Sequence, residues 1–115
     1  MSDADTASRF LEMSGLRDTD RDRYLACLLT PVGARGAIAA LYAFNAEIAR
    51  IRDLVHEPLP GEIRLQYWRD LLDGSAHGST EANPVAAALL ETMAKHRLPI
   101  AALTGMIEAR VFDLY

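Results

Sequence analysis

The chain has 115 residues, half of them hydrophobic and 24% charged. This length and composition indicate one globular domain and exclude both a disordered chain and two separately cored domains. The net charge of −4 provides no basic field for phosphate backbones, so the sequence argues against a nucleic-acid partner. The single cysteine, Cys27, cannot form an internal disulfide. With no apolar run of about 18 residues and no targeting pattern at the acidic N-terminus, we expect no transmembrane segment and a cytoplasmic location.

Abundant alanine, few aromatic residues and the absence of alternating β-branched runs predict an all-α chain. In chain order, the pattern first predicts a short peripheral helix over residues 7–14. A second helix over residues 20–29 is expected to be broken by Pro31 and Gly33. A long central helix should then cover residues 34–55.

The central helix carries an apolar seam whose members recur every three or four residues, which is the spacing of one helix face. The seam consists of Ala37, Leu41, Phe44, Ile48, Ile51 and Val55. The two prolines within residues 57–61 predict an extended linker after this helix. A fourth helix is expected over residues 61–73, stopped by Gly74 and followed by a polar loop over residues 74–81.

Asn83 followed by Pro84 predicts the start of the next helix, because the asparagine oxygen can accept from free backbone N–H groups and proline fits the first helical position. This helix should run to about His96, and Pro99 should open the last one. The helical pattern continues to Tyr115 without a glycine cap or a proline. We therefore expect the sequence to be part of a longer protein, with residues 1–19 as a peripheral segment and residues 20–115 as the helical domain.

A second face of the central helix is small or polar, and it can line a ligand cavity. Its members are Tyr42, Asn45, Ala46, Ala49 and Asp53. The competing interpretation is that Asn45 is hydrogen-bonded within the bundle and Asp53 is a solvated charge near the helix end. Trp68 is a further candidate for the cavity wall, with the hydrophobic core as the alternative.

The other side chains that could carry chemistry have no supporting pattern. His56, His77 and His96 lie far apart and match no metal-binding spacing, so solvated positions near helix ends are the better interpretation. Cys27 lies on an apolar helix with no histidine nearby in the sequence. A buried structural thiol is therefore expected rather than a nucleophile.

An ordered series of segments resembles the N-terminal portion of the squalene/phytoene synthase family over about residues 20–115. The segments are YLACLLTP, Arg35, ALYAFNAEIARIRDLV, GEIRLQYWRDLLDG, NPVAAALL and IEARVFDLY. The resemblance implies an all-α isoprenoid synthase fold with a central cavity. Catalytic members of the family join two prenyl diphosphates head to head, with magnesium held by two aspartate-rich motifs on facing helices.

The resemblance also shows where this sequence departs from the catalytic pattern. Ala49 and Arg50 occupy the leading aspartate positions of the first motif, and Asp53 is its only retained position. The second motif would lie beyond Tyr115. Other family positions are also changed, and they hold Asp22, Arg23 and Ala46. Because magnesium needs several hard oxygen ligands and an arginine repels it, no complete metal site and no catalytic residue are assigned.

These departures favour a catalytically degenerate family member, similar to the non-catalytic branch that includes a mitochondrial respiratory complex I assembly factor. The resemblance implies respiratory-complex subunits or an isoprenoid or lipid-like ligand as partners, peripheral membrane contact and no cofactor. One alternative is a head-to-head prenyltransferase of squalene or phytoene biosynthesis, which would need magnesium. The other is a helical interaction module without a ligand.

Overall fold

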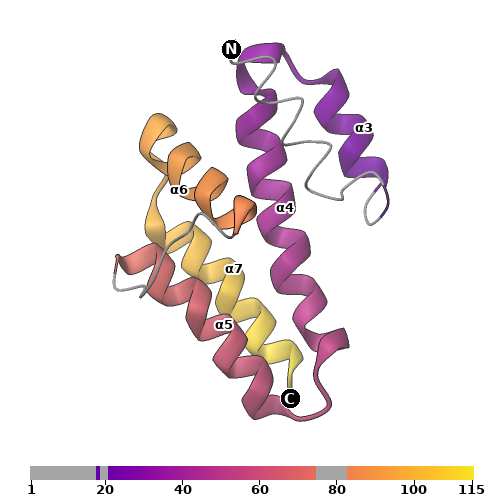
Figure 1. Cartoon of the computed structure of the whole chain (residues 1–115), viewed down its shortest axis with the longest axis vertical. Helices are drawn as coiled ribbons and strands as arrows, with labels where there is room; N and C mark the ends of the chain where they lie inside the picture. Colours follow the sequence, from indigo (N-terminus) through magenta and orange to yellow (C-terminus); the bar gives the residue numbers. More distant parts are fainter. Residues whose placement is uncertain (1–17, 19–20, 75–82) are drawn as a thin grey trace.

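The computed structural model describes residue 18 and residues 21–74 and 83–115. The predicted helix over residues 7–14 lies outside the described residues, as do nearly all of the predicted peripheral segment 1–19 and of the loop 74–81. The described residues form five helices and no strand: α3 (Arg21–Leu29), α4 (Val32–Leu54), α5 (Pro58–Asp73), α6 (Pro84–His96) and α7 (Ile100–Asp113) (Figure 1). The all-α prediction is confirmed.

The predicted break after α3 is confirmed, because α3 ends at Leu29 and Pro31 is the N-cap of α4. Gly33, however, was expected to lie before the central helix and lies instead in its first turn. The prolines assigned to an extended linker form the first turn of α5, which begins at Pro58. Both corrections have one cause, because the first turn of a helix has no internal partners for its N–H groups and so tolerates residues that disrupt the interior.

Other helix ends agree with the sequence. Gly74 caps α5 in the left-handed conformation, with φ of 84°. At the start of α6, the Asn83 side chain accepts a hydrogen bond from the Ala86 backbone N–H at 3.1 Å, with Pro84 in the first turn. Helix α6 ends at His96, and its C-cap, Arg97, takes a left-handed φ of 52° without being glycine. No signal in the sequence indicates this cap conformation.

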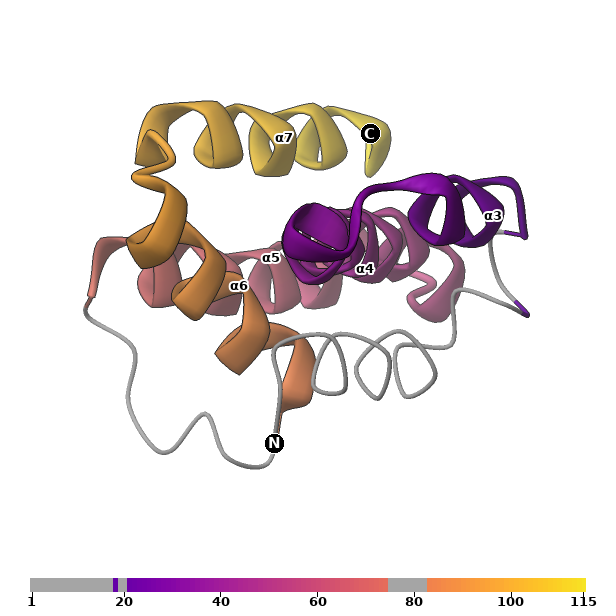
Figure 2. The ribbon, with the colours of Figure 1, turned by 90° about the horizontal axis from the view of Figure 1, so that it is seen from above.

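The central helix α4 contacts every other described helix. Helices α3 and α6 lie on opposite sides of it (Figure 1). Seen from above, α7 runs along one side of the layer that contains α4 and α5 (Figure 2). Helices α5 and α7 also contact each other, and a Cβ added at Gly61 of α5 would lie 2.7 Å from Leu114 Cδ2. The bundle is therefore organised around α4, with α3 attached at its edge.

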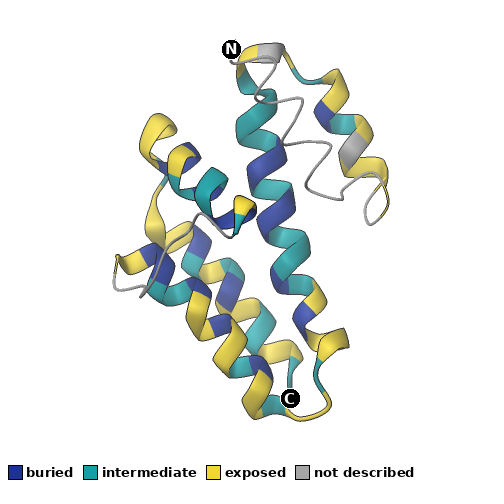
Figure 3. Cartoon of the chain, in the orientation of Figure 1, coloured by how far each residue is buried: buried dark blue, intermediate teal, exposed yellow. Residues whose placement is uncertain are grey.

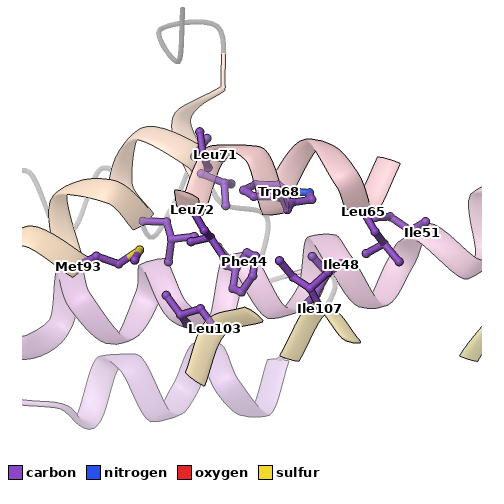
Figure 4. Packing of buried hydrophobic residues seen from close by; sticks show 14 residues of the cluster. Phe44, Ile48, Ile51, Leu65, Trp68, Leu71, Leu72, Met93, Leu103 and Ile107 are labelled. Carbon is purple, nitrogen blue, oxygen red and sulfur yellow. The ribbon is translucent and has the colours of Figure 1, made fainter. Parts of the chain in front are cut away.

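The main core lies where α4, α5, α6 and α7 meet, and the burial pattern follows these contacts (Figures 3 and 4). Phe44 and Ile48 of the predicted seam are almost completely buried. The ring of Phe44 packs edge-on against Trp68 of α5, with ring centroids 5.3 Å apart. Three large apolar residues of α5 turn outward, since Leu59 is 65%, Ile63 64% and Tyr67 39% exposed. Within the described residues, no helix combines the length and hydrophobicity needed to cross a bilayer.

Candidate ligand cavity

A cavity of about 410 Å³ lies between α3, α4 and the first half of α7. Its volume is at the lower end of the range for small-molecule sites, about 300–1,000 Å³. Apolar side chains make up most of its wall, and the chain contributes them from segments that lie far apart in the sequence. The lining residues are Arg23, Leu41, Tyr42, Asn45, Leu98, Pro99, Ala102, Leu103 and Met106.

Three lining residues carry polar groups, and all three come from α3 and α4. The guanidinium of Arg23 lies over the ring of Tyr42, with its carbon 5.6 Å from the ring centroid, a cation–π arrangement. Asn45 Oδ1 accepts a hydrogen bond from Arg110 Nη2 of α7 at 3.5 Å. Arg110 is itself paired with Asp113 at 3.2 Å. The polar groups among the described lining residues therefore all come from α3 and α4, although Leu41 of α4 is apolar, and the α7 side is apolar.

The residues proposed from the sequence as cavity candidates do not lie together. Tyr42 and Asn45 line this cavity, whereas Ala46, Ala49, Asp53 and Trp68 do not. Asp53 is exposed near the end of α4, and Ala49 is half-buried one turn beyond Asn45. Trp68 is 5% exposed and packs in the main core between Phe44 and Tyr67.

The positions that the resemblance assigns to the first metal motif carry side chains that do not fit a magnesium ion. Ala49 has no donor atom, and Arg50 carries a positive charge that forms an ion pair with Glu47 Oε2 at 3.0 Å. Asp53 is then the single carboxylate left among the motif positions, and magnesium requires several oxygen ligands. Across the described part of the chain, no three His, Cys, Asp or Glu side chains form a metal-binding group.

The sequence did not identify the α7 side of the cavity, which consists of Leu98, Pro99, Ala102, Leu103 and Met106. These residues reach the cavity because α7 packs beside α4, although the two segments lie far apart in the sequence. Their side chains are of the kinds found on any apolar helix face, so no pattern marks them as cavity residues. Arg23 was noted only as a departure from the family pattern. Its position facing Tyr42 depends on how α3 packs on α4, which helical spacing alone does not predict.

Arg35 joins α3 to α4 and thereby supports the wall that carries Arg23. Its guanidinium donates to three backbone carbonyls at the end of α3: to Cys27 O at 3.2 Å, Leu28 O at 3.0 Å and Thr30 O at 3.3 Å. Cys27 O and Leu28 O lie in the last turn of α3, where carbonyls lack the partner four residues on, although Cys27 O also accepts from the Thr30 N–H at 3.2 Å. A positive charge there is also favoured by the helix dipole.

The remaining candidates are placed as structural or solvent-exposed groups. Cys27 is completely buried between α3 and α4, as predicted, and burial raises the pKa of its thiol, with a smaller opposing effect from Arg35. His56 and His96 are exposed, and His77 lies outside the described residues. At the other end of the molecule, a hydrogen bond to Glu62 raises the pKa of Tyr115.

Comparison with known proteins identifies the family. The sequence profile described as squalene/phytoene synthase matches residues 16–115. Relatives named NADH dehydrogenase (ubiquinone) complex I, assembly factor 6 are 36% identical in Bos taurus and 33% identical in Homo sapiens, each over 99 residues and 86% of this chain. The homologue from Drosophila melanogaster is 33% identical over 104 residues and 85% of this chain.

The chain spans about 30% of the length of these relatives, 31% for the Drosophila melanogaster protein. No solved structure matches the chain. The profile match extends across all five described helices. The chain belongs to the squalene/phytoene synthase family.

Proposed function

We propose that this protein is a catalytically degenerate member of its family that acts in the assembly of respiratory complex I. The relatives named as assembly factors are 33–36% identical to this chain over 86% of its length. The proposal includes subunits of that complex as partners and a cytoplasmic location with peripheral contact to the membrane.

The observation that carries the non-catalytic part is the side-chain chemistry at the first motif. Coupling two prenyl diphosphates places a large negative charge in one site, which metal ions must neutralise. Here Ala49 supplies no ligand, and Arg50 is paired with Glu47 on the same helix face. Among the described residues that line the nearby cavity, none carries a carboxylate. These features support binding or assembly rather than turnover.

The assembly role is tested by deleting the gene in its native cell and measuring the amount of assembled complex I on native gels, together with NADH-dependent quinone reduction. We expect both to fall, and expression of the complete protein to restore them. Fractionation should place the protein on membranes and release it with high salt or carbonate. An unchanged amount of complex I after deletion would contradict the proposal.

The catalytic alternative has its own test, because Asp53 is retained at one motif position. The complete protein is incubated with labelled farnesyl or geranylgeranyl diphosphate and magnesium, with a catalytic family member as the positive control. We expect no coupled product. A product that forms with magnesium and disappears with a chelator would show that the protein is a prenyltransferase.

A further inference from the structure

We infer that the outer side of α3 and the turn that joins it to α4 form the surface that docks on a membrane, and that this membrane is an anionic phospholipid bilayer. The surface makes the peripheral membrane contact that is part of the proposed function, so the inference rests on that function. It follows from the exposed leucines of α3, the absence of acidic residues around the turn, and the position of the turn in the molecule.

Three leucines cover the outer side of α3. Leu25, Leu28 and Leu29 are 46%, 41% and 88% exposed. Because Leu28 and Leu29 follow Leu25 by three and four residues, all three lie toward one side of the helix, away from Cys27, which is buried against α4. The exposed Pro31 continues the apolar surface around the turn. Apolar side chains gathered in this way mark an interaction surface, unlike single exposed residues.

The segment around the turn has no negative charge. The chain has no acidic residue between Asp22 and Glu47, although its net charge is −4. Residues 24–34, which include the turn, carry no charged side chain at all, and Arg35 follows them. Anionic headgroups attract basic side chains and repel carboxylates. The leucines can therefore approach an anionic bilayer without bringing carboxylates of the turn against it.

The turn lies at one end of the long axis of the molecule. In Figure 1, α3 and α4 meet at the top of the view, where the chain turns from one helix into the other. The C-terminal end of α6 lies toward the same end, and its C-cap, Arg97, is exposed. A projecting apolar turn with a basic residue beside it suits a flat bilayer surface, whereas a partner helix usually lies in a groove.

The opposite end of the molecule also exposes apolar side chains, but they lie beside carboxylates. Phe112 is 82% and Tyr115 80% exposed. Asp113 follows Phe112 in the chain, and Glu62 forms a hydrogen bond with Tyr115. Carboxylates at this position oppose contact with anionic headgroups. Phe112 therefore provides a matched control for the leucines of α3.

The first test is co-sedimentation of the 115-residue protein with vesicles of phosphatidylcholine and phosphatidylglycerol in equal parts, and in parallel with vesicles of phosphatidylcholine alone. We expect binding to the mixed vesicles that weakens as salt is added, because salt screens the attraction between charges. Leu29→Glu should lower this binding about tenfold or more, because it removes an inserted apolar side chain and adds a negative charge. Phe112→Glu makes the same kind of change at the opposite end and should bind as the unaltered protein does.

A second pair of variants tests the charge. Arg97→Gly removes one positive charge, and glycine readily keeps the left-handed φ of 52° at this position. The variant should bind the mixed vesicles about fivefold more weakly and phosphatidylcholine vesicles unchanged. Arg64→Gln removes a charge from an exposed position of α5 and should bind as the unaltered protein does. Circular dichroism checks that the variants remain helical.

Insertion of the turn is measured separately from charge by tryptophan emission. Leu29→Trp places an indole at the most exposed of the three leucines. Its emission should move to shorter wavelength when mixed vesicles are added, because the ring leaves water for the bilayer interface. Phe112→Trp should show no such change. Trp68 is buried in the main core and gives both variants the same background.

Equal losses of binding for Leu29→Glu and Phe112→Glu, equal binding to both kinds of vesicle, or no binding by the unaltered protein would overturn the inference. A dimer in light scattering that Leu29→Glu dissociates would also overturn it, because a second copy would then cover the leucines. Complex I that falls after deletion of the gene, together with a Leu29→Glu protein that stays on membranes, would overturn the inference alone. Vesicle binding that depends on Leu29, together with unchanged complex I after deletion, would overturn the proposed function alone.

Discussion

Helix α4 packs against its neighbours through two clusters of very different size. The larger one joins α4 to α5, α6 and α7 and includes Phe44, Ile48 and Trp68. The smaller one joins α4 to α3 and has only Cys27 and Ala39 as buried members. On the outside of α3, Leu29 is 88% exposed, so this helix buries little apolar surface. The comparison indicates that hydrophobic packing holds the main bundle, whereas α3 depends more on polar contacts such as those of Arg35.

This difference matters for the cavity, which lies between the two clusters. Its α4 and α7 walls belong to the well-packed bundle, while Arg23 belongs to α3. Regions with few buried apolar contacts open at a lower free-energy cost than the core. The polar end of the cavity should therefore be the part that moves most easily, and the predictions below separate the two clusters.

The largest effect is expected from Phe44→Ala. Phe44 is completely buried and contacts Trp68, so its removal leaves a void in the main core. Such a change costs about 3–5 kcal/mol of unfolding free energy. Since small domains have about 5–15 kcal/mol in total, we expect a large fall in the urea midpoint. Phe112→Ala is the matched control, because Phe112 is 82% exposed and its loss should shift the midpoint little. Similar shifts for both variants would contradict the assigned core.

Arg35→Ala should loosen α3 and leave the main core intact. It removes three hydrogen bonds to the carbonyls of Cys27, Leu28 and Thr30, which we expect to cost about 1–3 kcal/mol. Amide hydrogen exchange should accelerate in α3 much more than in α5 and α7. Arg35→Lys should recover only part of the protection, since an ammonium lacks the planar fork of a guanidinium. Arg64→Ala, at an exposed position of α5, provides the control. Uniform acceleration along the chain would show that α3 is not a separate unit.

Asn83→Ala should have a smaller effect, confined to the main bundle. It removes the cap of α6 and costs about 1 kcal/mol. Asn83 Nδ2 also donates to the Tyr67 hydroxyl at 3.2 Å, so Tyr67→Phe removes that bond while keeping the cap. We expect Asn83→Asp and Tyr67→Phe to stay close to the unaltered protein in thermal melts. A loss with Tyr67→Phe as large as with Asn83→Ala would assign the effect to the hydroxyl contact.

The cap at Asn83 illustrates what the sequence predicts well. Local chemistry at Asn83, Gly74 and Pro99 indicated helix ends, because a cap depends on residues only a few positions apart. Helical spacing identified Phe44 and Ile48 as core residues for the same reason. The prolines at the start of α5 were misassigned because a proline marks a boundary without showing on which side the helix lies.

The cavity was only half predictable. Spacing along α4 selected Tyr42 and Asn45, but the same stripe continues to Ala49 and Asp53, which lie beyond the cavity. Which residues of the stripe line the cavity depends on where α3 and the start of α7 lie along α4. Their placement is a property of tertiary packing. The contacts of Arg23 and Ala102 likewise connect helices that no local pattern relates.

The smallest effect concerns the pH dependence of the α3 cluster. Burial raises the pKa of the Cys27 thiol above its ordinary value of 9.0, so the unfolded chain releases this proton at lower pH than the folded one. Folded-state stability from this group is therefore complete below the unfolded pKa and is lost as pH rises through that value toward the folded pKa. Between about pH 8 and pH 10, the unaltered protein should lose more unfolding free energy than Cys27→Ala does. The difference between the two proteins isolates the thiol from other groups that titrate in the same range. If the unaltered protein and Cys27→Ala lose equal unfolding free energy in denaturant titrations, the thiol of Cys27 loses its proton without opening of α3. The cluster of Cys27 and Ala39 would then be more accessible than its burial indicates.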